Sequence, residues 1–413
     1  MRTTAEIQTP ASGLPSTTCV IAICIAEILG LASYSIVPAL LPQFIEAWSL
    51  STTQAGWLAG SLFAGYMLGV VPLVTLTDTV SARTIYLAAS ALSVVSTLGV
   101  ALSGDLVPAL VFRALGGISL AGMYMPGLRA LTEGCDGRRR SRIAGLYTSS
   151  FTIGTAVSFL VGTASAVWGW RTAFVVSAAA GAVSLAIAWG ALPHPTTLAA
   201  TRGAAAFSFR AALRNHDAVI LMIAYGATIW GAVALRQWIV LFLAFCAGDP
   251  TQSDWSMLAV ASLISLLGVP AGLLGIELAI RCGLRLAATL IFLAAAVVTG
   301  LFGFAAMLPF GMAAVAALAA SFVAQGTFSN LTSGLLAVVV PRYAGVTMAF
   351  YSCIGFGGGF LGNVLFGVTL DRLGGASELH AWTIGFGTCG FAFLVGAGAT
   401  AFLSRHVERA PAA

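Results

Sequence analysis

Twelve long apolar runs dominate this chain of 413 residues and decide what it can fold into. An α-helix needs about 20 mainly apolar residues to cross a bilayer core about 30 Å thick. Only 8% of the residues are charged, whereas soluble domains carry about 25%. The chain therefore cannot cover a surface that faces water, and we predict an all-α membrane protein with twelve transmembrane helices. The runs occupy roughly residues 17–40, 52–75, 83–103, 107–131, 142–166, 172–192, 217–245, 254–279, 285–307, 310–338, 343–369 and 379–403.

The connections between the runs are short, and the longest divides the chain into six runs and six. We expect an N-terminal six-helix bundle at residues 17–192 and a C-terminal six-helix bundle at 217–403. A cytosolic central loop, 193–216, joins them. Residues 1–16 and 404–413 form cytosolic tails. The first run is longer than a signal-peptide core and lacks a small-residue cleavage site, so we read it as an uncleaved span.

Arginine positions predict how the chain is oriented, because basic residues are retained on the cytosolic side of a membrane. With the N-terminus in the cytosol, the outer loops hold only Arg171 and Arg372. The inner segments hold the other loop and tail arginines, namely Arg2, Arg83, Arg129, Arg138, Arg139, Arg140, Arg142, Arg202, Arg210, Arg214, Arg281, Arg285, Arg342, Arg405 and Arg409. This distribution predicts cytosolic termini in a bacterial inner membrane. The basic segment around Arg138 is expected to contact anionic lipids rather than nucleic acid.

Two segments, one from each half, match at an offset of 200 residues. They are SRIAGLYTSSFTIGTAVSFLVG (141–162) and PRYAGVTMAFYSCIGFGGGFLG (341–362). Parallel repeats of this kind place a substrate path at their interface, near the middle of the membrane. The coinciding residues are Arg142/Arg342, Ala144/Ala344, Gly145/Gly345 and Gly162/Gly362.

Together with these repeats, two partial motifs give a family resemblance. The loop VTLTDTVSAR (74–83) keeps Asp78 and Arg83 of a G-x-x-x-D-R-x-G-R-R pattern, and R-x-x-x-G survives as Arg113 to Gly117. The chain thereby resembles the major facilitator superfamily over its whole length. The glycine-proline motif of the family's antiporters is absent from residues 152–162.

The resemblance implies secondary active transport by alternating access, with two pseudo-symmetric six-helix bundles rocking around a central site. It also implies a gating role for the position of Asp78. We expect Asp78 to pair with Arg83 or Arg129, or to face the N-terminus of helix eleven, where the helix dipole favours an anion. Glycine pairs at four-residue spacing, such as Gly56/Gly60, predict close packing between helices.

Two charged residues lie deep inside predicted spans. Glu27 is about ten residues into the first span, and Arg113 lies at a similar depth in the fourth. Charges at such depth are expensive and are functional by default. We interpret Glu27 as a proton carrier and Arg113 as a substrate-binding group that pairs with it. A structural ion pair between two helices is the alternative. All four histidines lie in loops or tails, so no histidine relay competes with Glu27.

Other polar residues in the spans are weaker candidates for binding a solute. Arg236, expected toward the outer mouth, would either bind substrate or extend to the membrane interface. The others could bind a solute or simply a neighbouring helix, and they are Tyr34, Tyr124, Gln325 and Asn330.

The sequence offers nothing that indicates an enzyme. Its seven cysteines are scattered, and we find no metal-ligand spacing, nucleotide loop or catalytic triad. We therefore expect no cofactor and no metal. Two buried arginines against one buried acid favour a monomeric symporter that takes up a small organic or inorganic anion with protons. Proton-driven efflux of drugs or metabolites is one alternative. A membrane sensor that binds a solute without transporting it is another.

Overall fold

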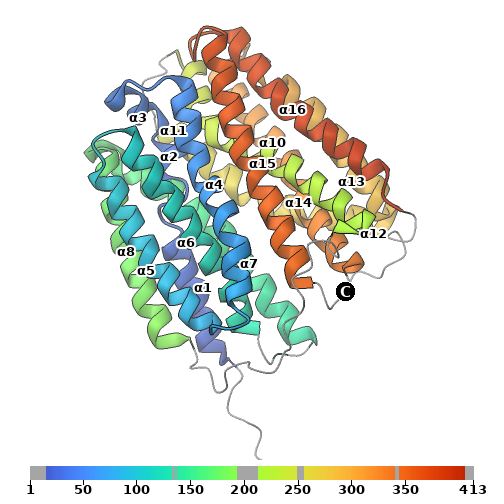
Figure 1. Cartoon of the computed structure of the whole chain (residues 1–413). Helices are drawn as coiled ribbons and strands as arrows, with labels where there is room; N and C mark the ends of the chain where they lie inside the picture. Colours follow the sequence, from blue (N-terminus) through green and yellow to red (C-terminus); the bar gives the residue numbers. More distant parts are fainter. Residues whose placement is uncertain are drawn as a thin grey trace, which may run out of the picture.

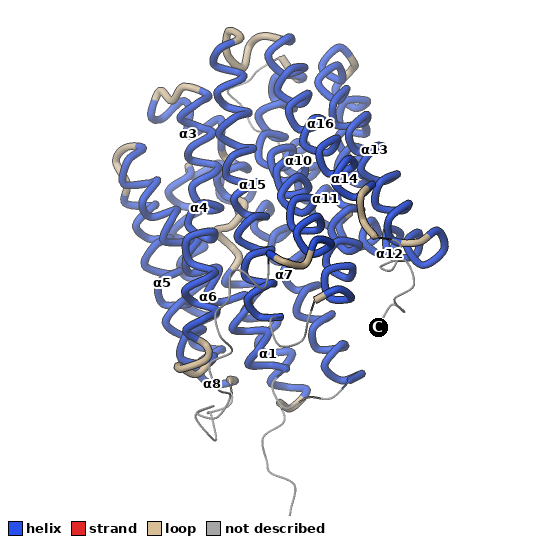
Figure 2. Tube along the Cα trace, turned by 45° about the vertical axis from the view of Figure 1, so that its right-hand side comes forward, coloured by secondary structure: helices blue, strands red, loops and turns tan. Residues whose placement is uncertain are grey.

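The structure, a computed structural model, describes residues 15–132, 135, 137–192, 213–248, 255–339 and 344–404. Most of the predicted tails and central loop lie outside these residues. Within them the fold is helical throughout, without a strand (Figures 1 and 2). The helices are α1 (Thr17–Gly30), α2 (Ile36–Ala39), α3 (Leu41–Trp48), α4 (Thr52–Leu76), α5 (Ala82–Leu102), α6 (Leu106–Thr132), α7 (Gly137–Ser165), η1 (Ala166–Trp168), α8 (Trp170–Ala191), α10 (His216–Cys246), α11 (Trp255–Leu266), α12 (Gly268–Cys282), α13 (Leu284–Leu301), η2 (Phe302–Met307), α14 (Phe310–Val338), α15 (Ala344–Arg372) and α16 (Leu379–Ala401).

Eleven helical segments in the described part of the chain are long and apolar enough to cross a membrane. They coincide with eleven of the twelve predicted runs, and the protein is an integral membrane protein. The first run is the exception. The helix α1 covers only 14 residues before the chain turns, and α2 and α3 complete the crossing. The prediction of one continuous first helix is therefore wrong, although the span itself is present.

Proline and serine explain the break in the first span. Pro38 has no backbone N–H, so it cannot bond the carbonyl of Tyr34 one turn earlier. Serines from neighbouring helices satisfy the exposed backbone instead. Ser158 of α7 donates to the carbonyl of Ala32 (2.6 Å) and accepts from the Ser35 N–H (2.8 Å). Ser177 of α8 also donates to Ala32 (3.1 Å). The break is therefore held by three elements and is not a loose kink.

The two segments that match in sequence make equivalent contacts in the two halves. A Cβ on Gly162 of α7 would lie 2.8 Å from Ala39, in the first span of its own half. A Cβ on Gly362 of α15 would lie 2.5 Å from Trp230 on α10, the first helix of the other half. In both cases a glycine lets the fifth helix of a bundle approach the first helix closely.

The halves meet mainly through α4 and α15. The start of α1 and the end of α16 lie at one end of the molecule, here named the termini end, and the opposite end is the far end (Figure 1). From Thr52 at the far end, α4 packs along α15 as far as Met67. A Cβ on Gly56 would lie 2.6 Å from the carbonyl oxygen of Asn363, and one on Gly367 would lie 2.3 Å from that of Thr52. Glycine thus allows the two backbones to touch.

We expect Gly56→Val to destabilise the protein, because its side chain would collide with the α15 backbone. Overpacking of this kind costs about 1–3 kcal/mol, and thermal unfolding in detergent would measure it. Gly398→Val on α16 is the matched control, because nothing lies within 4 Å of a Cβ there. Equal melting temperatures for the two variants would contradict the described contact.

Candidate functional site

Arg113 on α6 is bound by the break in the first span. Its side chain is buried, and it donates to the carbonyls of Ser33 (3.2 Å) and Tyr34 (3.5 Å). The Tyr34 carbonyl is available because Pro38 cannot bond it. The guanidinium Nε is buried without a hydrogen-bond partner. A deeply placed cation is therefore held by backbone oxygens alone among the described residues.

Glu27 near the end of α1 is also buried, but it faces a different helix. One carboxylate oxygen, Oε2, accepts a hydrogen bond from Ser150 of α7, and Oε1 has no partner. The phenol groups of Tyr86, Tyr124 and Tyr147 lie close enough to interact with it electrostatically. Ser150 was not singled out from the sequence, because nothing there shows which face of α7 meets α1.

The predicted pair of Glu27 and Arg113 does not form in this structure. The ion pairs among the described residues are Arg129–Asp78, Arg281–Glu277 and His380–Glu378. Equal depth suggested the pair, but depth does not fix direction around the helix. Glu27 turns to α7, whereas the chain after Gly30 leaves the helix and brings its carbonyls to Arg113.

Arg236 on α10 joins the two halves. Its guanidinium donates to the hydroxyl of Tyr34 (3.1 Å) and lies 5.4 Å from the centre of that ring. Tyr34 in turn contacts the rings of Phe63 on α4 and Phe151 on α7, with ring centres 6.2 and 5.8 Å away. A half-buried cation thus lies against the Tyr34 ring where the first span meets α10.

The remaining predicted site residues divide between the halves. Tyr124 stacks on Tyr147, near Glu27. Gln325 on α14 donates to the carbonyl of Ile264 on α11 (2.7 Å). Asn330 is fully buried against Gly275 of α12, and neither polar atom of its side chain has a partner. The structure therefore places Tyr34 with Arg236 and Tyr124 with Glu27, while Gln325 and Asn330 bind or pack against helices of the C-terminal half.

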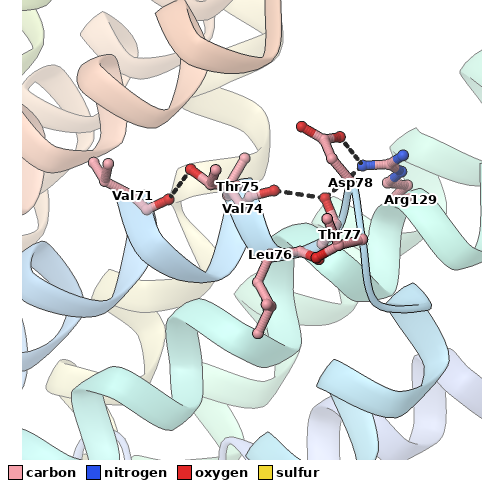
Figure 3. Close-up of polar contacts among 8 residues, drawn as sticks. Val71, Val74, Thr75, Leu76, Thr77, Asp78 and Arg129 are labelled. Atoms are coloured by element: carbon pink, nitrogen blue, oxygen red, sulfur yellow. Dashed lines mark hydrogen bonds and ion pairs between the residues drawn. The ribbon is translucent and has the colours of Figure 1, made fainter. Parts of the chain in front are cut away.

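The predicted gate residues lie at the termini end of α4. Arg129 donates to Asp78 (3.2 Å) and to the hydroxyl of Thr77, as Figure 3 shows. This is one of the two pairings expected for Asp78. Arg83 makes a different contact, donating to the carbonyl of Trp189 on α8 (2.7 Å). Asp78, Arg129 and Thr77 therefore form one polar cluster at this end, and Arg83 lies outside it.

A second contact, at the far end, links the halves and was not predicted. The hydroxyl of Thr52, the first residue of α4, donates to the carbonyl of Gly367 (3.0 Å) and to Asp371 of α15 (3.3 Å). Asp371 thereby lies at the N-terminus of α4, where a helix dipole favours negative charge. The contact was not predicted because nothing in the sequence shows that the start of α4 and the end of α15 meet.

The family model described as Major Facilitator Superfamily matches residues 23–363. The chain belongs to this superfamily. The all-helical fold of the described residues, with eleven long spans and a broken first one, agrees with membership in this family of transporters.

Two relatives show how far the similarity in sequence extends. The chain is 27% identical over 220 residues to the 3-(3-hydroxy-phenyl)propionate transporter of Escherichia coli (strain K12), covering 52% of this chain and 54% of the relative. It is 30% identical over 148 residues to the multidrug transporter MdfA of Yersinia pestis bv. Antiqua (strain Angola), covering 36% and 35%. The matched segments span about half of the first relative and a third of the second.

Solved structures share the fold over nearly the whole chain. A bacterial homolog of the human lysosomal transporter Spinster, in an inward-facing and occupied conformation, matches with a TM-score of 0.77 at 17% identity. The match covers 96% of this chain and 99% of the other. The nucleoside transporter NupG matches with a TM-score of 0.72 at 15% identity, covering 93% and 98%. At these identities the likeness concerns the fold alone.

We expect Asp78→Asn to alter opening at the termini end with little loss of stability. The Asp78–Arg129 pair is partly exposed, so its removal costs at most about 1 kcal/mol. Glu277→Gln removes the exposed pair with Arg281 on α12 and is the matched control. Spin labels at Gly145 and Gly345, which have open surroundings at the termini end of each half, would report their separation by pulsed electron resonance in a cysteine-free background. If Asp78 acts in gating, Asp78→Asn changes the distribution of distances between the two labels and Glu277→Gln does not.

Proposed function

We propose that this transporter takes up a small organic anion together with protons by alternating access. The observation that carries the proposal is Arg236. Its guanidinium lies where the two halves meet, and its polar contact is the hydroxyl of Tyr34 rather than a carboxylate. A cation without an acid partner at the interface of two repeats suits an anionic substrate.

The surroundings of Arg236 favour an organic anion over an inorganic one. The Tyr34 ring supplies flat apolar surface beside the cation, and the rings of Phe63 and Phe151 pack edge-on against Tyr34. An aromatic carboxylate could stack on these rings while its carboxylate binds the guanidinium. The relative named as a 3-(3-hydroxy-phenyl)propionate transporter supports this class. We therefore assign the substrate as an aromatic or similarly flat carboxylate.

Glu27 is the proposed proton carrier. An ionised carboxylate at this position would be a buried charge without a cationic partner, which is costly in a membrane protein. We assign the protonated form to the present state, with Ser150 donating to Oε2. Rocking of the two bundles would change the solvation of Glu27 and release the proton.

The proposed orientation places the termini end in the cytosol of a bacterial cell. Arg138, Arg139, Arg140 and Arg142 are exposed at this end, at the start of α7. The contacts of α4 with α15 close the far end in this state, so the present conformation would admit solute from the cytosolic side. Import would require substrate to load in the opposite state, which is open at the far end. The contact between Asp371 and Thr52 must break to reach that state.

Proton-driven efflux is the second candidate. The similarity to the multidrug transporter MdfA favours it, as does an acid in the first helix with an arginine in the fourth. An exporter of drugs would be expected to bind lipophilic and often cationic compounds, which Arg236 would repel. A sensor that binds without flux is a third possibility, and reconstituted transport separates it from the other two.

The test is uptake of aromatic carboxylates, beginning with 3-(3-hydroxyphenyl)propionate, into proteoliposomes with and without a pH gradient. We expect the gradient to stimulate uptake. Arg236→Gln should lower uptake at least about tenfold, because it removes one hydrogen bond between charged groups. Arg171→Gln, which removes a contact to the Ser103 carbonyl on α5, is the control and should leave uptake unchanged.

Glu27→Gln separates coupling from binding. It should abolish the stimulation by the gradient while exchange of substrate between the two sides continues. Gradient-stimulated uptake that survives Glu27→Gln would refute the assigned proton carrier. Export of lipophilic cations with no movement of any carboxylate would refute the substrate class.

A further inference from the structure

A small cavity beside Arg113 lies inside the N-terminal half, and Tyr34, which Arg236 contacts, contributes to its lining. It has a volume of about 20 Å³, and a site of this size accommodates one ligand of about the size of water. Every residue that lines it belongs to the first half, between Gly30 and Phe174. The residues with polar side chains in its lining are Ser33, Tyr34, Ser93, Ser96, Thr97, Arg113 and Ser119.

The charge in this cavity has no counter-charge from the described chain. No acidic residue lines it, and Arg113 takes part in no ion pair among the described residues. The two bonds from its guanidinium to carbonyls are long, at 3.2 and 3.5 Å, and Nε has no partner. A buried cation in this setting is strongly destabilising unless an anion compensates it.

The hydroxyl groups around the cavity differ in what they can offer. Ser96 and Ser119 donate to the helix carbonyls of Ser93 and Gly116, at 3.0 and 2.7 Å. Ser33 is different, because its oxygen accepts from Thr97 (3.2 Å) and its own proton remains available. An anion in the cavity could therefore accept hydrogen bonds from both Ser33 and Arg113.

We propose that this cavity binds one monoatomic anion, a halide such as chloride, as the resident counter-ion of Arg113. The volume is too small for a carboxylate with an organic body, which separates this site from the proposed substrate site. The halide would neutralise the cation that holds the break of the first span. Its binding would stabilise the fold of the N-terminal half and does not depend on which solute the protein transports.

The test is thermal unfolding of the purified full chain in detergent. Sodium chloride and sodium bromide are titrated against sodium gluconate at constant ionic strength. Both halides should raise the melting temperature in a saturable way, as expected for a ligand that binds only the folded state. Bromide should also give an anomalous diffraction peak in the cavity beside Arg113.

Variants connect the effect to the site. Ser33→Ala should weaken halide binding at least about tenfold, since it removes a hydrogen bond to a charged group. Arg113→Gln should abolish halide binding. If the Arg113→Gln variant fails to fold, Ser33→Ala still tests the proposal. Arg236→Gln should lose substrate uptake but keep the full halide response, so failure of the proposed function would be recognised separately. Halides that act no better than gluconate, or a response unchanged in Ser33→Ala, would overturn the proposal.

Discussion

The break in the first span is the constraint on which the rest of the N-terminal half depends. In a membrane every backbone group must be satisfied within the protein, because lipid offers no hydrogen bonds. Interrupting a helix at residues 31–35 exposes carbonyls that would otherwise be bonded within it. Ser158 and Ser177 donate hydrogen bonds to the carbonyl of Ala32, and Arg113 donates to those of Ser33 and Tyr34. The same break turns the Tyr34 side chain toward the other half, where it meets Arg236.

The second requirement is an interface that two rigid bundles can make and release. The close approach of two helix backbones provides it. Helix association in lipid depends on close packing and hydrogen bonds rather than on the hydrophobic effect. Gly56 and Gly367 let α4 and α15 touch at the far end, and Thr52 adds hydrogen bonds to α15 there. At the other end of α4, Asp78 bonds Arg129 within its own half. The helix α4 therefore has polar contacts at both ends, to α15 at one end and to α6 at the other.

Spans and family could be predicted from the sequence because apolar runs of about 20 residues have few alternatives. The pairing of Asp78 with Arg129 was one of three arrangements expected for Asp78, beside a pair with Arg83 and a place at the N-terminus of helix eleven. The Glu27–Arg113 pair was not obtained, because hydropathy gives depth but not the direction of a side chain around a helix. Pro38 was a visible signal for the break, yet only the structure shows that Arg113 uses the carbonyl that Pro38 leaves without a donor. Ser150 and Asp371 needed the packing of helices far apart in sequence.

The central claim is that the transported carboxylate binds between the halves at Arg236 and not inside the N-terminal half at Arg113. The most direct measurement is a cryo-electron microscopy structure of the chain in lipid nanodiscs with a transported aromatic carboxylate. The account predicts density for the carboxylate at the Arg236 guanidinium, with its ring against Tyr34, Phe63 or Phe151. Carboxylate density at Arg113, or a solute bound without contact to Arg236, would contradict it.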